Sequence, residues 1–196
     1  MTIAELVRER LPHAPQMGLY VAPDLSEKKV RNARSDYARD VDRAEVLALY
    51  DATLSGTGGD GAVFAPDRFV FQNNDFQSVQ TVRYRDLVGV EVGNRWFGLG
   101  GKRVSLKVNR GRATFDLAMD FSGAPDAAEY VADFLHAAML KDVEFGSTEG
   151  GATDETDVAA VHRVLDRLRG QGKLTASDHE RLLQVLTEQR DAASDS

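Results

Sequence analysis

The sequence predicts an α+β protein in which short antiparallel strands form a bent sandwich or barrel that a helix closes. Between residues 46 and 117, six or seven short apolar runs recur about every ten residues, separated by turn signals such as Gly58-Gly59-Asp60-Gly61. The segments between the runs are too short for crossover helices, so we expect antiparallel pairing. A helical pattern follows at 125–140 and is expected to cover an open end of the barrel.

The composition is that of a globular chain without thiol chemistry. Of the 196 residues, 42% are hydrophobic and 28% are charged, close to the globular average, and there is no cysteine. Disulfides, thiolate metal sites and a cysteine nucleophile are therefore excluded. The net charge of −7 opposes binding to nucleic acid. We expect a cytoplasmic protein, because the N-terminus lacks a signal-peptide pattern and no apolar run reaches the ~18–20 residues that span a bilayer.

Residues 1–45 are predicted to form an N-terminal helical extension. Thr2 and Glu5 have the spacing of a capping box, which predicts a short first helix. A brief apolar run at 18–22 is expected to be an edge strand, and Ser26 is a plausible N-cap for a second helix. Four apolar residues then recur at helical spacing and should share one face of that helix: Val30, Ala33, Tyr37 and Val41.

Residues 46–142 are predicted to form the β domain with its capping helix. Pro125 lies in the first turn of that helix, where its missing N–H does no harm. The apolar face of the helix is expected to contain Tyr130, Val131, Phe134, Leu135 and Ala138. The predicted strands are 46–54, two short strands within 62–71, then 80–84, 87–92, 103–109 and 112–117.

The C-terminal part is predicted to be a linker followed by two short helices. Residues 143–157 are acidic and glycine-rich, which is typical of a solvated linker. Residues 158–190 have two helical patterns across a glycine turn, and Thr175 and Asp178 have capping-box spacing. A hairpin this small has little core of its own, so we expect it to dock on another surface or to self-associate.

Three short motifs in the β domain resemble those of a known family. Residues 49–56 read LYDATLSG, residues 60–64 read DGAVF and residues 82–87 read VRYRDL. Together they resemble the opening of bacterial pleckstrin-homology-like (PH-like) domains, and the likeness extends over residues 25–140. The resemblance implies a seven-stranded, strongly bent antiparallel sheet capped by a C-terminal helix.

The C-terminal hairpin resembles a second family. Residues 165–168 read LDRL and residues 172–175 read GKLT, close to the Gly-x-Ile-Thr step of the SHOCT module, with Leu174 in place of the isoleucine. Such modules are short helical hairpins. The resemblance implies a role in oligomerisation or docking, with no chemistry attached.

The glycine-rich stretch 56–61 has two interpretations. Residues 58–61 resemble the Gly-Gly-Asp-Gly turn of lipid and NAD kinases, which suggests a nucleotide site. However, the stretch lacks the Gly-Lys-Ser/Thr of a P-loop and is followed by an apolar strand pattern, which favours a hairpin turn. Asp51 and Thr53 just before it are expected to bond neighbouring backbone. In phosphoinositide-binding relatives the first hairpin supplies the basic residues, whereas this hairpin carries Asp60 and no base.

The best candidate binding surface is the longer loop at 93–103. It places Trp96 and Phe97 in a glycine-rich tip next to Arg95, Lys102 and Arg103, with Arg110 and Arg112 in the following turn. Trp96 either folds back onto the barrel, inserts into a protein partner, or meets an anionic lipid together with these bases.

The sequence therefore favours a non-enzymatic interaction protein without metal or cofactor. The four histidines lack metal-ligand spacing, and no serine lies in a nucleophile elbow. The expected partner is a protein, or a second copy bound through 158–190. The alternatives are peripheral binding to anionic membrane lipid and, less favoured, a nucleotide-binding enzyme.

Overall fold

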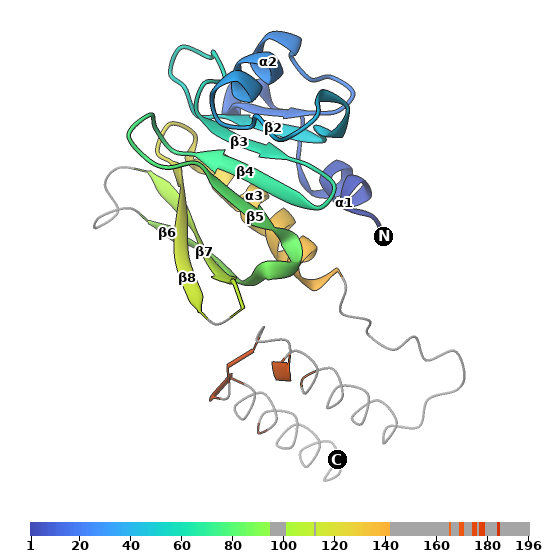
Figure 1. Cartoon of the computed structure of the whole chain (residues 1–196), viewed down its shortest axis with the longest axis vertical. Helices are drawn as coiled ribbons and strands as arrows, with labels where there is room; N and C mark the ends of the chain where they lie inside the picture. Colours follow the sequence, from blue (N-terminus) through green and yellow to red (C-terminus); the bar gives the residue numbers. More distant parts are fainter. Residues whose placement is uncertain are drawn as a thin grey trace, which may run out of the picture. The chain divides into compact units, whose positions relative to one another are not determined.

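The computed structural model of the chain describes residues 1–94, 101–111 and 113–141, and from the C-terminal part residues 165, 169–170, 174–175, 177–178 and 184 (Figure 1). The chain divides into two compact units, Met1–Lys141 and Asp142–Ser196. In the second unit, the Asp178 N–H donates to Thr175 Oγ1 at 3.1 Å, as the predicted helix cap requires. The predicted linker 143–157 and most of the predicted hairpin 158–190 lie outside the described residues.

The first unit confirms the α+β prediction, with two antiparallel sheets and three α-helices (Figure 1). The five-stranded sheet has the order β1 (Leu19–Val21), β2 (Ala48–Asp51), β3 (Gly61–Phe64), β4 (Arg68–Gln72) and β5 (Gln80–Arg83). The three-stranded sheet has the order β6 (Leu87–Asn94), β7 (Lys102–Asn109) and β8 (Thr114–Phe121). The helices are α1 (Ile3–Arg10), α2 (Glu27–Asp36) and α3 (Pro125–Leu140).

The first helix begins as predicted, whereas the second is shorter than predicted. In the capping box of α1, the Thr2 N–H donates to the Glu5 carboxylate at 2.6 Å and the Glu5 N–H donates to Thr2 Oγ1 at 3.2 Å. Helix α2 ends at Asp36, so Val41 lies beyond it. The chain after the helix folds back, and Arg34 holds it there by donating to the Val41 C=O at 2.8 Å. Val41 is therefore still buried beside the helix.

Two strand predictions needed correction. The strand predicted over 46–54 ends at Asp51, because the Asp51 carboxylate accepts the Thr53 N–H at 3.0 Å and turns the chain. Leu54 is consequently fully exposed. The strand predicted over 112–117 is observed as β8 and continues to Phe121. On α3, which has its predicted start, Tyr130 is half exposed while the other four residues of its predicted apolar face are buried.

The main hydrophobic core joins both sheets to α1 and α3. Tyr50 on β2 stacks on Phe121 on β8 with ring centroids 4.4 Å apart. Phe64 on β3 meets Phe134 on α3 edge-on at 5.5 Å. Because successive side chains of a strand face opposite ways, these residues leave the other face of the sheet to be covered separately. Such rings in contact add to the stability that their burial provides.

A second, smaller core covers that other face of the five-stranded sheet. Val30 and Tyr37, from α2 and the residue after it, pack with Leu49, Val63 and Val70 on β2, β3 and β4. The layer formed by α2 thus reaches β4. The five-stranded sheet is buried on both faces along β2, β3 and β4, as Figure 1 shows for α2 over the sheet.

Among the described residues, no helix has the length and apolar character needed to cross a membrane.

We predict that Gly61→Ala will destabilise the fold far more than Gly111→Ala. Both glycines have a positive φ, +134° and +80°, where an L side chain is strained by roughly 1–2 kcal/mol. At Gly61 a Cβ would also lie 1.9 Å from the Tyr50 carbonyl oxygen, whereas nothing lies within 4 Å at Gly111. Urea unfolding of both variants measures the difference. If the two variants lost equal free energy of unfolding, the close approach of β2 and β3 would not be what constrains the hairpin.

Candidate functional site

The predicted glycine turn is held by a buried ion pair. Lys29 on α2 places its Nζ 2.5 Å from Asp51 Oδ2 at the end of β2, and the two side chains are 14% and 2% exposed. Lys29 also donates to the Gly56 C=O and lies 5.0 Å above the Tyr20 ring. The loop between β2 and β3 is thereby attached to α2, 22 residues earlier in the chain.

The same carboxylate occupies two of the backbone donors of this loop. Asp51 Oδ1 accepts the N–H groups of Thr53 at 3.0 Å and Gly58 at 3.1 Å. The chain then continues directly into β3, whose Gly61 pairs with Asp51. The loop therefore closes an antiparallel hairpin, as the turn interpretation predicted, and the Gly58 N–H already has an anionic acceptor.

The electrostatics of this pair stabilise both charged forms. Burial alone raises the pKa of Asp51, but hydrogen bonds from Lys29 and Thr53 outweigh it and hold that pKa below its ordinary value. Burial likewise lowers the pKa of Lys29, and its hydrogen bond to Asp51 outweighs this and raises it. Both groups are ionised at neutral pH, and each serves as the partner of the other.

The structure separates the described bases of the predicted loop surface. Arg95, Trp96 and Phe97 lie outside the described residues. Lys102 and Arg103 follow one another on β7, so their side chains point to opposite faces of the strand. Lys102 Nζ bonds Glu129 on α3 at 2.9 Å, while Arg103 is in register with Asp120 on β8.

Arg110, in the following turn, is also engaged within the fold. Its guanidinium donates to the Thr81 C=O at 3.1 Å and lies 5.9 Å from the Phe115 ring centroid. The described bases that were expected to form one anion-binding patch therefore lie apart, and two of the three already have partners.

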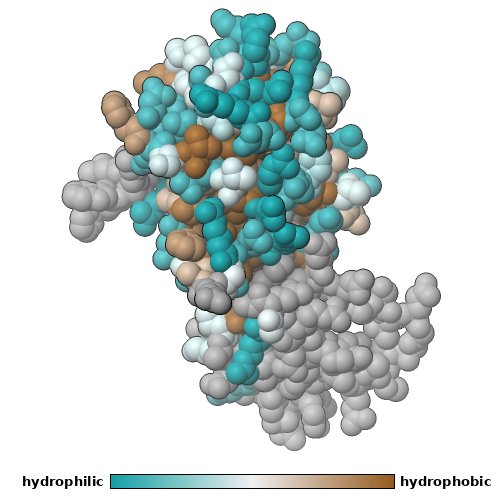
Figure 2. Space-filling model, viewed as in Figure 1, coloured by the Kyte–Doolittle hydropathy of each residue, from teal (hydrophilic) through white to brown (hydrophobic). Residues whose placement is uncertain are grey.

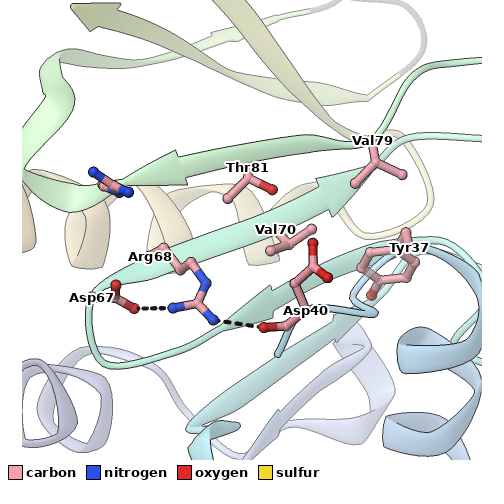
Figure 3. A pocket seen from close by; sticks show the side chains of 8 residues that line it. Tyr37, Asp40, Asp67, Arg68, Val70, Val79 and Thr81 are labelled. Carbon is pink, nitrogen blue, oxygen red and sulfur yellow. Dashed lines mark hydrogen bonds and ion pairs between the residues drawn. The ribbon is translucent and has the colours of Figure 1, made fainter. Parts of the chain in front are cut away.

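A hollow that the sequence did not indicate lies on the outer face of β4 and β5 (Figure 3). It has a volume of about 300 Å³. Val70 on β4, and Val79 and Thr81 on or just before β5, form its floor, and Tyr37 lies at its side (Figure 3). The hollow exists because the layer that begins with α2 ends over β4 and leaves the outer face of β5 uncovered. Val79 remains 42% exposed there.

The rim of the hollow carries charges of both signs. Arg68 is fixed, because it donates to the Asp67 carboxylate at 2.7 Å and to the Asp40 C=O at 2.8 Å (Figure 3). Arg83 is exposed and has no ion-pair partner among the described residues, and the same holds for the Asp40 carboxylate. One base and one acid are therefore available at the rim beside an apolar floor.

In the view of Figure 2, the described surface is mostly hydrophilic, with only small separate apolar patches. Within the described part of the chain, no group of three His, Cys, Asp or Glu residues is placed to hold a metal ion.

The chain matches no protein-family model, and comparisons with curated proteins and with solved structures found no match.

We predict that Asp51→Asn will lower the free energy of unfolding at pH 7 by ~3–5 kcal/mol, since it leaves the Lys29 ammonium without its buried counter-charge. The folded-state pKa of Asp51 is lowered, so its contribution is present above the unfolded pKa of ~3.9 and is lost as the pH falls through the folded value. The difference between wild type and variant should therefore shrink below about pH 4. Urea unfolding from pH 3 to 8 tests this.

Arg43→Ala is the matched control, because Arg43 forms an ion pair with Glu27 in which both side chains are mostly exposed. It should change stability by no more than ~0.5 kcal/mol. A pH-independent effect of Asp51→Asn would contradict the assignment of its stabilisation to the charged pair.

Proposed function

We propose that the chain is a non-enzymatic interaction protein with a PH-like first unit, and that this unit binds a protein partner in the hollow on β4 and β5. The observation that carries the proposal is the incomplete cover of the five-stranded sheet. The layer begun by α2 stops at β4, and Val79 and Thr81 remain uncovered beside Arg83, which has no ion-pair partner among the described residues.

The arrangement of strands supports the PH-like part of the proposal. The seven strands from β2 to β8 pair antiparallel in chain order, as four strands of the first sheet and three of the second. Helix α3 follows the last strand and packs on β6, β7 and α1. This is the strand number and the capping helix that the motifs at 49–56, 60–64 and 82–87 imply, with β1 added at the edge beside β2.

The chemistry of the hollow suits a protein segment. Its apolar floor, Val70 and Val79, would bury an apolar side chain of the partner, and burial of that side chain supplies the affinity. Arg83 would bind a carboxylate of the partner, and Asp40 would bind a base. Charges at the rim of an interface select the partner and its orientation. A partner with an apolar residue between an acid and a base fits all three features.

Self-association through 158–190 is the second part of the proposal. Its support is the sequence of that segment, the observed cap at Thr175, and the division of the chain at Lys141.

We predict that a photoreactive residue introduced at Thr81 of the full chain will crosslink to a partner in the cells of origin. Arg83→Glu should lower the crosslink yield by about tenfold, because it places an acid where the partner's carboxylate binds. Arg85→Glu, the same change at an exposed arginine outside the lining of the hollow, should leave the yield unchanged. The measurement is the amount of adduct on a denaturing gel.

Crosslinking that survives Arg83→Glu would contradict the hollow as the binding site. Anionic vesicles serve as a second control: because Lys102 is already bonded to Glu129, we expect no cosedimentation at physiological salt. Cosedimentation that Trp96→Ala combined with Lys102→Glu abolishes would support the lipid alternative instead.

We predict that the full chain forms an oligomer and that a truncation ending at Lys141 is monomeric. The truncation retains the first compact unit and removes the segment that is expected to self-associate. Size-exclusion chromatography with light scattering gives the two masses. Monomers in both cases would rule out self-association through the C-terminal segment.

A further inference from the structure

The free edge of β8 is a second surface that the proposed function does not use. Among the strands that the structure describes, β8 pairs with β7 alone, so its other side is an edge. Backbone N–H and C=O groups on an edge strand have no ladder partner within the sheet, and an edge of this kind can accept a further strand. How this edge is occupied in the fold indicates what it can bind.

One end of the edge is already paired with a side chain that imitates a strand. The Asn73 amide donates to the Ala118 C=O at 2.8 Å, and its oxygen accepts the Asp120 N–H at 2.9 Å. One residue of a parallel neighbouring strand would make the same two bonds with its own N–H and C=O. They show that Ala118 and Asp120 direct their backbone groups outward, and the alternation along a strand assigns the same direction to Asp116.

The remaining part of the edge borders a groove of about 390 Å³. Asp116, Leu117 and Ala118 line one side of the groove. The loop before β5 and the first residue of that strand line the other with the polar residues Gln77, Ser78 and Gln80. This volume is within the ~300–1,000 Å³ typical of ligand sites. The loop is ordered by its own bonds, since the Gln72 amide donates to the Gln77 C=O at 3.2 Å.

The side chains of β8 specify what an added strand should carry. On the outer face of the sheet, Asp116 is exposed and forms no ion pair among the described residues. On the other face, Leu117 packs on the main core. Phe115 lies on the same face as Leu117 and is 47% exposed. Residues directly opposite each other on neighbouring strands interact on the same face. Bases are therefore favoured on one face of an added strand, and apolar residues on the other.

We propose that the edge of β8 binds an extended peptide segment in which basic and apolar residues alternate. Its backbone pairs with Asp116 and with the Ala118 N–H, its bases lie beside Asp116, and its apolar side chains cover Phe115 and Leu117. Asn73 ends the site and sets its register. Pairing with β8 of a second copy is disfavoured, because it would bring the acids Asp116 and Asp120 of both copies onto one face.

The test uses the full chain and a fluorescent peptide of about seven residues with alternating lysine and valine. Fluorescence anisotropy should show saturable binding. A peptide of the same composition in blocks should bind about tenfold more weakly, because it cannot place bases and apolar residues on separate faces. An alternating peptide methylated on the backbone nitrogens that face β8 should not bind, because it keeps the charge and loses the ladder bonds.

Two protein variants complete the test. Asp116→Lys should weaken binding by about tenfold. Glu91→Lys, an equal change of charge at an exposed acid on β6, should not. Equal binding of the alternating, block and methylated peptides would show general attraction to an acidic chain and would overturn the proposal. Absence of saturable binding up to about 1 mM would also overturn it. Both peptide comparisons use the unaltered protein, so they do not depend on the folding of a variant.

Discussion

The arrangement of the first unit depends on the buried pair of Lys29 and Asp51. An ion pair this enclosed contributes little net energy, but it cannot be separated cheaply, because either charge alone would be buried without a partner. The pair joins α2 to the end of β2, and Asp51 in turn fixes the loop to β3 through Gly58. It therefore determines where α2 lies on the sheet and how the first hairpin closes.

The position of α2 then determines which part of the sheet remains open. A helix of ten residues that is attached at β2 covers β2, β3 and β4, and the chain turns back at Val41 before it reaches β5. The outer faces of Val79 and Thr81 are uncovered for this reason. The hollow is thus a consequence of a short helix at a fixed position, and its apolar floor is the continuation of the smaller core around Val70.

The local elements could be predicted from sequence, and the contacts between them could not. The capping box at Thr2 and the start of α3 at Pro125 follow from short-range rules that the structure obeys. By contrast, Lys29 stands on the polar face of an amphipathic helix and resembles any solvated lysine in the sequence. The hollow depends on where α2 stops. Lys102 was expected at an anion site, and nothing in the sequence indicated its bond to Glu129, which lies 27 residues further along the chain. Each of these features is set by tertiary contacts.

The edges of β5 and β8 are both partly closed by side chains, and the extent of this closure determines where a further strand could pair. At β5 the outward Thr81 C=O is bonded by Arg110, and at β8 the Asn73 amide occupies the Ala118 C=O and the Asp120 N–H. Side chains that bond an edge shorten the length available to another strand, which is how edges are protected from unwanted pairing. Between Asn73 and the turn at Arg110 this protection is incomplete at Asp116. At that point only the negative charge of Asp116 opposes pairing. This charge disfavours an acidic strand and favours a basic one.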